Sequence, residues 1–105
     1  MPVPGLRGKD VEILRGTFRN FSFVQEVRVF GSRANGIARR SSDLDLAISS
    51  AGATPTEWAE LCDALQSTPI IYEFDIVRPE RLTNERLKAK IAREGVTIYP
   101  EKAES

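Results

Sequence analysis

Hydrophobic residues recur along the chain at two spacings, one typical of helices and the other typical of strands. Apolar side chains three and four positions apart predict three amphipathic helices, at 9–18, 57–66 and 84–94. Alternating or β-branched stretches predict four strands, at 25–30, 43–48, 70–77 and 96–99. Gly95 follows the last helix and is expected to be its C-cap.

The order of these elements predicts an α/β (α+β) fold, with a mixed sheet of about four strands and helices packed mainly on one face. A length of 105 residues suits one compact domain. We therefore expect a single domain over 1–105, with 1–8 and 101–105 as flexible ends.

Composition and charge exclude several classes of function. Lys and Arg together number 15, as do Asp and Glu, so the net charge is zero, which argues against nucleic acid as the main partner. The absence of histidine excludes Ser-His-Asp catalysis and His-ligated zinc. The single cysteine excludes an intrachain disulfide. No apolar run has membrane-spanning length, so we expect a cytoplasmic protein with no membrane contact.

Two aspartates occupy alternate positions of the second predicted strand. Asp43 and Asp45 point to one side of the strand, while Leu44, Leu46 and Ile48 point to the other and pack against helices. Two carboxylates this close repel each other unless a positive charge lies between them. Mg²⁺ characteristically binds one or two carboxylates together with substrate phosphates, so the pair predicts a magnesium site.

The third predicted strand supplies another carboxylate. Asp75 and Glu73 point away from the apolar side chains of that strand. If the strand pairs beside 43–48, Asp75 lies on the metal side, where it could bind a second ion or accept the proton of an attacking hydroxyl. Glu73 has the same parity as Asp75, so its role stays open.

Gly31 and Ser32 follow the first predicted strand. Glycine allows a close backbone approach, and the Ser32 hydroxyl with neighbouring N–H groups can hold phosphate oxygens. Arg33 or Arg39 could add positive charge there. Together with Arg40 these arginines are equally compatible with a solvated basic turn, so their roles stay open.

These pieces together resemble a known signature. Gly31-Ser32, ten residues, and then Asp43-Leu44-Asp45 resemble the nucleotidyltransferase signature of the DNA polymerase β superfamily. The fuller runs 30–36 and 41–46 resemble the minimal nucleotidyltransferase (MNT) family more narrowly, with 74–77 at the third-carboxylate position. The resemblance covers nearly the whole chain and implies a nucleotidyltransferase palm.

The resemblance also implies roles for individual residues. It assigns triphosphate contacts to Gly31 and Ser32, and we include Arg33 and Ser42 as further candidate nucleotide-binding residues. It assigns catalysis and metal binding to Asp43, Asp45 and Asp75, with two Mg²⁺ ions expected alongside a bound NTP.

Members of this family are often MntA-like antitoxins paired with HEPN-domain proteins, which are helical RNases. Some silence that partner by transferring AMP to its tyrosine, so the resemblance implies an ATP-dependent antitoxin with a HEPN-type partner. Two alternatives stay open: a binding module that neutralises its partner by contact alone, and nucleotide transfer to RNA or a small molecule. A palm this short also favours a hetero-oligomer or a homodimer.

The same residues have simpler interpretations. Asp43 and Asp45 could face solvent on a half-exposed strand, and Gly31-Ser32 could be an ordinary turn. Large apolar side chains and the thiol are expected in the core or at an interface: Phe18, Phe21, Phe23, Trp58 and Cys62.

Overall fold

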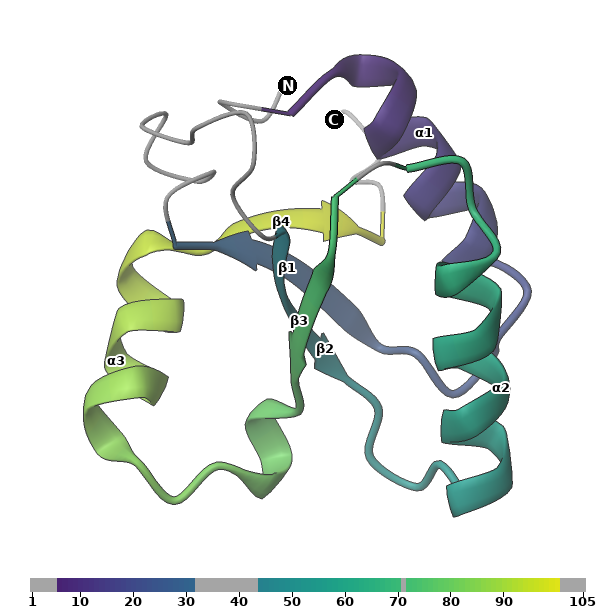
Figure 1. Cartoon of the computed structure of the whole chain (residues 1–105). Helices are drawn as coiled ribbons and strands as arrows, with labels where there is room; N and C mark the ends of the chain where they lie inside the picture. The colour runs from purple at the N-terminus through teal and green to yellow at the C-terminus, as the bar shows by residue number, and fades with distance from the viewer. Residues whose placement is uncertain (1–5, 32–43, 71, 101–105) are drawn as a thin grey trace, which may run out of the picture.

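The computed structural model describes residues 6–31, 44–70 and 72–100, which form a four-stranded sheet with helices on both faces (Figure 1). Its elements are α1 (Gly8–Phe18), β1 (Glu26–Phe30), β2 (Leu44–Ser49), α2 (Pro55–Gln66), β3 (Phe74–Val77), the 3-10 helix η1 (Pro79–Arg81), α3 (Glu85–Glu94) and β4 (Val96–Tyr99). The strand order is β3-β2-β1-β4. β1 pairs antiparallel with β2 and β4, while β2 and β3 are parallel, so the sheet is mixed as predicted.

The main core lies between the sheet and helices α1 and α2, which cover one face (Figure 1). Alternate strand residues point into this core because successive side chains of a strand point to opposite faces. The side chains that are fully buried there include Leu14, Phe18, Val27, Val29, Leu44, Leu46, Ile48, Leu61 and Leu65. The predicted alternation in the first two strands is therefore confirmed.

A smaller core lies on the opposite face, under α3. Phe30, Ala47 and Ile91 are buried in it, with Val77 and Leu87 packed at its edge. Two of the three α-helices thus share one face, as predicted, while α3 covers the other (Figure 1). The apolar stripe of α3 predicts that one side of the helix is buried, but it does not predict which face of the sheet the helix covers.

Two elements begin at residues that the sequence pattern did not predict. α2 starts at Pro55, because Thr54 forms a capping box: the Thr54 hydroxyl accepts from Glu57 N at 3.1 Å, and the Glu57 carboxylate accepts from Thr54 N at 2.8 Å. β3 covers only Phe74–Val77 instead of 70–77. The described ladder with β2 runs from Phe74 opposite Leu44 to Val77 opposite Ala47, and Leu44 N–H also donates to Glu73 O at 2.8 Å.

The start of the chain is more ordered than expected at residues 6–8. Leu6 is buried against the main core, and Gly8 already belongs to α1. Arg7 forms a 3.2 Å ion pair with Asp10, a helix residue only 1% exposed. The predicted flexible end at 1–8 is therefore wrong for these three residues, while 1–5 and 101–105 lie outside the described residues.

Gly95 ends α3 as the predicted C-cap, although not in the left-handed conformation typical of such glycines. Its φ is −67°, and its N–H donates to Ile91 O at 2.8 Å. A Cβ at this position would collide with that same carbonyl oxygen and lie 3.1 Å from Arg28 Cδ. Glycine is favoured at this position because there is no room for a Cβ, and not because its backbone angle excludes other residues.

The aromatic side chains lie where the sequence predicted. Phe18 is fully buried, and Phe21, Phe23 and Trp58 pack against the main core. Within the described part of the chain, no helix combines the length and apolar character that crossing a membrane requires.

Candidate active site

Two carboxylates meet on neighbouring strands at one end of the sheet. Asp45 of β2 and Asp75 of β3 are register partners in the parallel ladder, which puts their Cα atoms about 4.8 Å apart. Register partners point to the same face, and here that is the α3 face, because Leu44 and Phe74 beside them point into the main core. Asp45 is half-buried and Asp75 is exposed.

Gly31 directly follows β1 and contacts the Asp45 side chain. β1 ends at Phe30, the register partner of Asp45, so the chain turns at Gly31 beside that carboxylate. The φ of Gly31 is +76°, a conformation that favours glycine. A Cβ here would overlap Asp45 Oδ2 and lie 3.2 Å from Asp45 Cγ. Both backbone angle and space therefore restrict this position to glycine.

The structure thus brings together three of the predicted site residues: Gly31, Asp45 and Asp75. The other four lie outside the described residues, namely Ser32, Arg33, Ser42 and Asp43, as do Arg39 and Arg40. Glu73 is exposed and directly precedes β3, two residues before Asp75. It therefore lies just outside the ladder in which Asp75 pairs with Asp45. The chemical roles of all these residues remain predictions.

Comparison with protein families gives one match that spans most of the chain. Residues 12–104 match the family described as "Polymerase beta, Nucleotidyltransferase". The chain belongs to this nucleotidyltransferase family. No curated protein matches it.

Solved structures extend the comparison. The nucleotidyltransferase is 33% identical to a protein assigned provisionally as a minimal nucleotidyltransferase, with a TM-score of 0.67 over 84% of this chain and 92% of the other. A toxin-antitoxin solved with AMP-PNP gives a TM-score of 0.71 at 21% identity, over 89% of this chain and 75% of that chain. A mutant of the toxin-antitoxin MntA-HpeT gives 0.64 at 21% identity, over 92% and 75%. The resemblance to minimal nucleotidyltransferases is confirmed, and the two more distant structures show a shared fold.

The carboxylates of this nucleotidyltransferase suit a hard divalent cation. Within residues 6–31, 44–70 and 72–100 no three His, Cys, Asp or Glu side chains form a metal-binding group, but Asp45 and Asp75 form an adjacent pair. Mg²⁺ commonly takes only one or two protein carboxylates and completes its coordination with phosphate oxygens and water. The backbone of Gly31 packs directly against the Asp45 carboxylate, so the turn after β1 lies beside this acid. The described residues therefore fit a magnesium ion that arrives with a nucleotide.

The nucleotidyltransferase also has a cationic pocket that the sequence analysis did not identify. It has a volume of about 160 Å³ and lies on the α3 face, lined by Arg28 of β1 and Lys88 of α3 among others. The alternation of β1 already placed Arg28 opposite Val27 and Val29, hence on the face of Asp45. Lys88 reaches the same pocket because α3 covers this face of the sheet. The sequence pattern did not predict which face α3 covers.

Proposed function

We propose that this protein transfers a nucleoside monophosphate, AMP from ATP, to an acceptor hydroxyl. The acceptor we favour is a tyrosine of a HEPN-type toxin partner, which would make the protein an antitoxin. The single observation that carries the proposal is the pairing of Asp45 with Asp75 beside the side-chain-free Gly31. ATP and Mg²⁺ are both supplied in the cytoplasm, which is where we place the reaction.

In the proposed reaction, the acceptor oxygen attacks the α-phosphorus of ATP. The bond from that phosphorus to the β-phosphate oxygen breaks, and its electron pair leaves with pyrophosphate. Mg²⁺, when bound, supplies positive charge opposite the phosphate oxygens. Asp45 would hold the ion together with Asp43, the other predicted carboxylate of this strand. Asp75, exposed beside Asp45, either accepts the hydroxyl proton or holds a second ion.

The predicted phosphate contacts come from the turn after β1. The backbone of Gly31 can approach phosphate oxygens closely because no Cβ intervenes. Ser32, Arg33 and Ser42 remain the further proposed nucleotide ligands. A toxin-antitoxin of similar fold that was solved with AMP-PNP supports nucleotide binding as part of the proposal.

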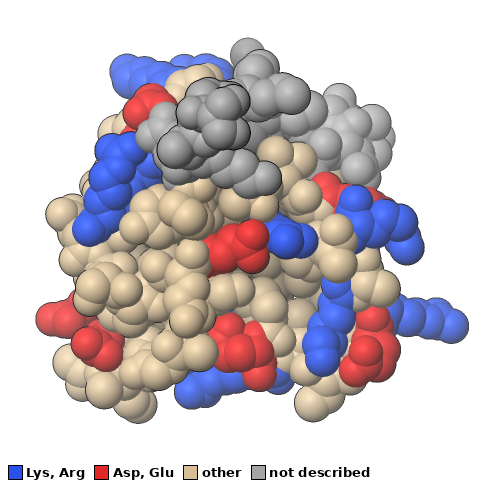
Figure 2. Space-filling model, turned by 180° about the vertical axis from the view of Figure 1, so that it is seen from behind, with Lys and Arg blue, Asp and Glu red and all other residues tan. Residues whose placement is uncertain are grey.

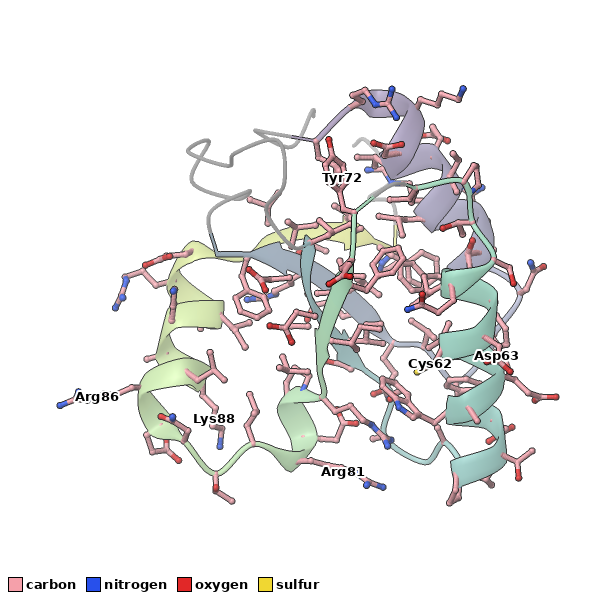
Figure 3. The ribbon with its side chains drawn as sticks, in the orientation of Figure 1. Cys62, Asp63, Tyr72, Arg81, Arg86 and Lys88 are labelled. Carbon is pink, nitrogen blue, oxygen red and sulfur yellow. The ribbon has the colours of Figure 1, made fainter. Side chains whose placement is uncertain are left out.

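Label transfer with variants of single carboxylates tests the proposal. The full chain, Mg²⁺, α-labelled ATP and a co-purified partner are incubated, and label on the partner is counted. Asp45→Asn removes the charge but keeps the side-chain shape, so transfer should fall by about 100-fold or more. Asp63→Asn is the matched control, because Asp63 is exposed on α2, away from the pair (Figure 3). Equal transfer by both variants would refute the enzymatic proposal.

Toxin-antitoxin structures among the similar folds also favour a second candidate, neutralisation by contact alone. In that case a partner toxin is inhibited without ATP. Growth rescue of cells that express the toxin separates the two: rescue lost with Asp45→Asn indicates transfer, while rescue that persists indicates contact. Transfer to RNA or to a small molecule would appear as label on those acceptors instead.

A further inference from the structure

Charge is unevenly distributed between two helices of this chain, whose net charge is zero. α2 carries only acidic charged residues, namely Glu57, Glu60 and Asp63. α3 is richer in basic residues, with Arg86, Lys88, Lys90 and Arg93 against Glu85 and Glu94. Figure 2 shows several Lys and Arg side chains on the side of the molecule that belongs to α3, interspersed with Asp and Glu. Net charge alone therefore does not show the excess of basic over acidic residues on α3.

The cationic pocket is lined in part by α3. Arg28 lines it from the sheet and Lys88 from α3, while Ala47, Pro79, Ile91 and Ala92 give it mainly apolar walls. In Figure 3, Lys88 points from α3 toward η1, whereas Arg86 points away from the protein. A volume of about 160 Å³ is below the roughly 300 Å³ at which ordinary ligand pockets begin. The pocket is therefore sized for a single side chain.

The guanidinium of Arg28 is only partly satisfied by the described residues. Its Nε is buried and has no hydrogen-bond acceptor there. That same Nε lies 3.4 Å from Glu26 Oε2, an ion pair whose oxygen also accepts a hydrogen bond from Thr97 Oγ1 at 3.3 Å. Lys88 has only a 3.6 Å pair with Glu85, whose side chain is 84% exposed. The structure shows one ion pair for each of these two cations among the described residues, and both cations line the pocket, so an anionic group that enters it can still pair with them.

We propose that this pocket binds an acidic side chain of a partner protein, with the carboxylate against Arg28 and Lys88 and the methylene groups against the apolar walls. The surrounding basic residues of α3 would attract the acidic surface that carries this side chain. The site is distinct from the Asp45–Asp75 pair, since Phe30 and Ala47 are packed between them. It therefore goes beyond nucleotide transfer and provides a means of holding an acceptor or toxin protein.

The geometry favours a protein carboxylate over the phosphates of RNA. Phosphate backbones are bound by exposed cations that follow a strand, whereas Arg28 is recessed and its side chain is only 32% exposed. Glu26 also lines this pocket, and its negative charge repels the phosphates of RNA more strongly than it repels a single carboxylate. Apolar walls suit the methylene groups of glutamate.

Fluorescence anisotropy with a labelled oligoglutamate peptide tests the proposal, with a labelled RNA oligonucleotide of equal charge as the comparison. The full chain is used without nucleotide, so the result does not depend on transfer activity. Lys88→Gln and Arg28→Gln should each weaken peptide binding by about fivefold. Arg86→Gln and Arg93→Gln remove the same charge from exposed α3 positions outside the pocket, and should change binding by less than about twofold.

Amide chemical shifts locate the bound peptide. The proposal expects saturable shifts at Arg28, Lys88 and Ala92, and these should also appear in Asp45→Asn, which separates this site from the proposed active site. Equal losses for all four charge variants would indicate general attraction and overturn the proposal, as would absent shifts at the pocket. Tighter binding of the RNA at these same residues would overturn it in favour of nucleic acid. Lys88→Gln, an exposed position, keeps the test valid if Arg28→Gln does not fold.

Discussion

Gly31 approaches the Asp45 carboxylate so closely that no side chain fits between the end of β1 and that acid. This contact joins the turn that is expected to hold phosphates to the residue that is expected to hold the metal. A second glycine with positive φ, Gly52, has open space around the position of a Cβ. The two glycines therefore separate the effect of backbone angle from the effect of the contact.

Gly31→Ala should lower the free energy of unfolding by more than Gly52→Ala does. Both variants place alanine at positive φ, at a cost of about 1 kcal/mol, but only Gly31→Ala displaces Asp45. We expect Gly31→Ala alone to abolish AMP-PNP binding. Urea unfolding and calorimetry measure the two effects. Normal AMP-PNP affinity in Gly31→Ala would show that the close approach has no part in nucleotide binding.

Asp75→Asn should reduce transfer by about 100-fold, the usual contribution of a positioned proton acceptor. Glu73→Gln is the control on the same segment, because Glu73 is exposed and precedes the ladder with β2; it should retain activity within about twofold. Unchanged AMP-PNP affinity with lower kcat in Asp75→Asn would assign the proton role, and weaker affinity for AMP-PNP with Mg²⁺ would assign a metal role. Full activity in Asp75→Asn would remove this residue from the site.

Gly95→Ala and Gly16→Ala should change stability in opposite directions. A methyl group at Gly95 meets the Ile91 carbonyl and the Arg28 side chain, so a loss of about 1–3 kcal/mol is expected. Gly16 lies inside α1 with nothing near the added Cβ, and alanine there should add about 0.5–1 kcal/mol. Thermal and urea unfolding give both values. A stable Gly95→Ala would mean that α3 can shift on the sheet without cost.

Burial raises the pKa of the Cys62 thiol, with Asp63 contributing in the same direction. The folded protein therefore keeps the thiol neutral at a pH where the unfolded chain ionises. Its contribution to stability is complete below the ordinary thiol pKa of about 8.5 and is lost as the pH rises through the higher folded value. Unfolding free energies of the natural protein and Cys62→Ala, measured across this range, should converge as the pH increases. A constant difference between them would contradict the raised pKa.

The buried face of the sheet could be predicted from sequence because strand side chains alternate strictly. Shifting β2 by one residue would bury Asp45 and expose Leu44 and Leu46, so the pattern allows one orientation only. The meeting of Asp45 and Asp75 was predicted on the condition that their strands pair. That condition depends on contacts distant in sequence, which local periodicity does not determine.

Two features could not be predicted for physical reasons. The choice of sheet face by α3 depends on which apolar surface remains uncovered after α1 and α2 have packed, and this is a property of the assembled fold. The pairing of Arg28 with Lys88 in one pocket follows from that choice. Local sequence patterns predict each helix and strand, but they do not predict which face of the sheet a given helix covers.

The parallel ladder between β2 and β3 fixes the spacing of the two acids through main-chain hydrogen bonds, which every residue type except proline can form. The connection between these strands, which contains α2, has no direct part in that spacing. Insertions or deletions at its surface turns can therefore accumulate without changing the spacing of Asp45 and Asp75. Evolution can in this way remodel the outer side of the molecule, including the surfaces that select a partner, while the reaction geometry stays constant.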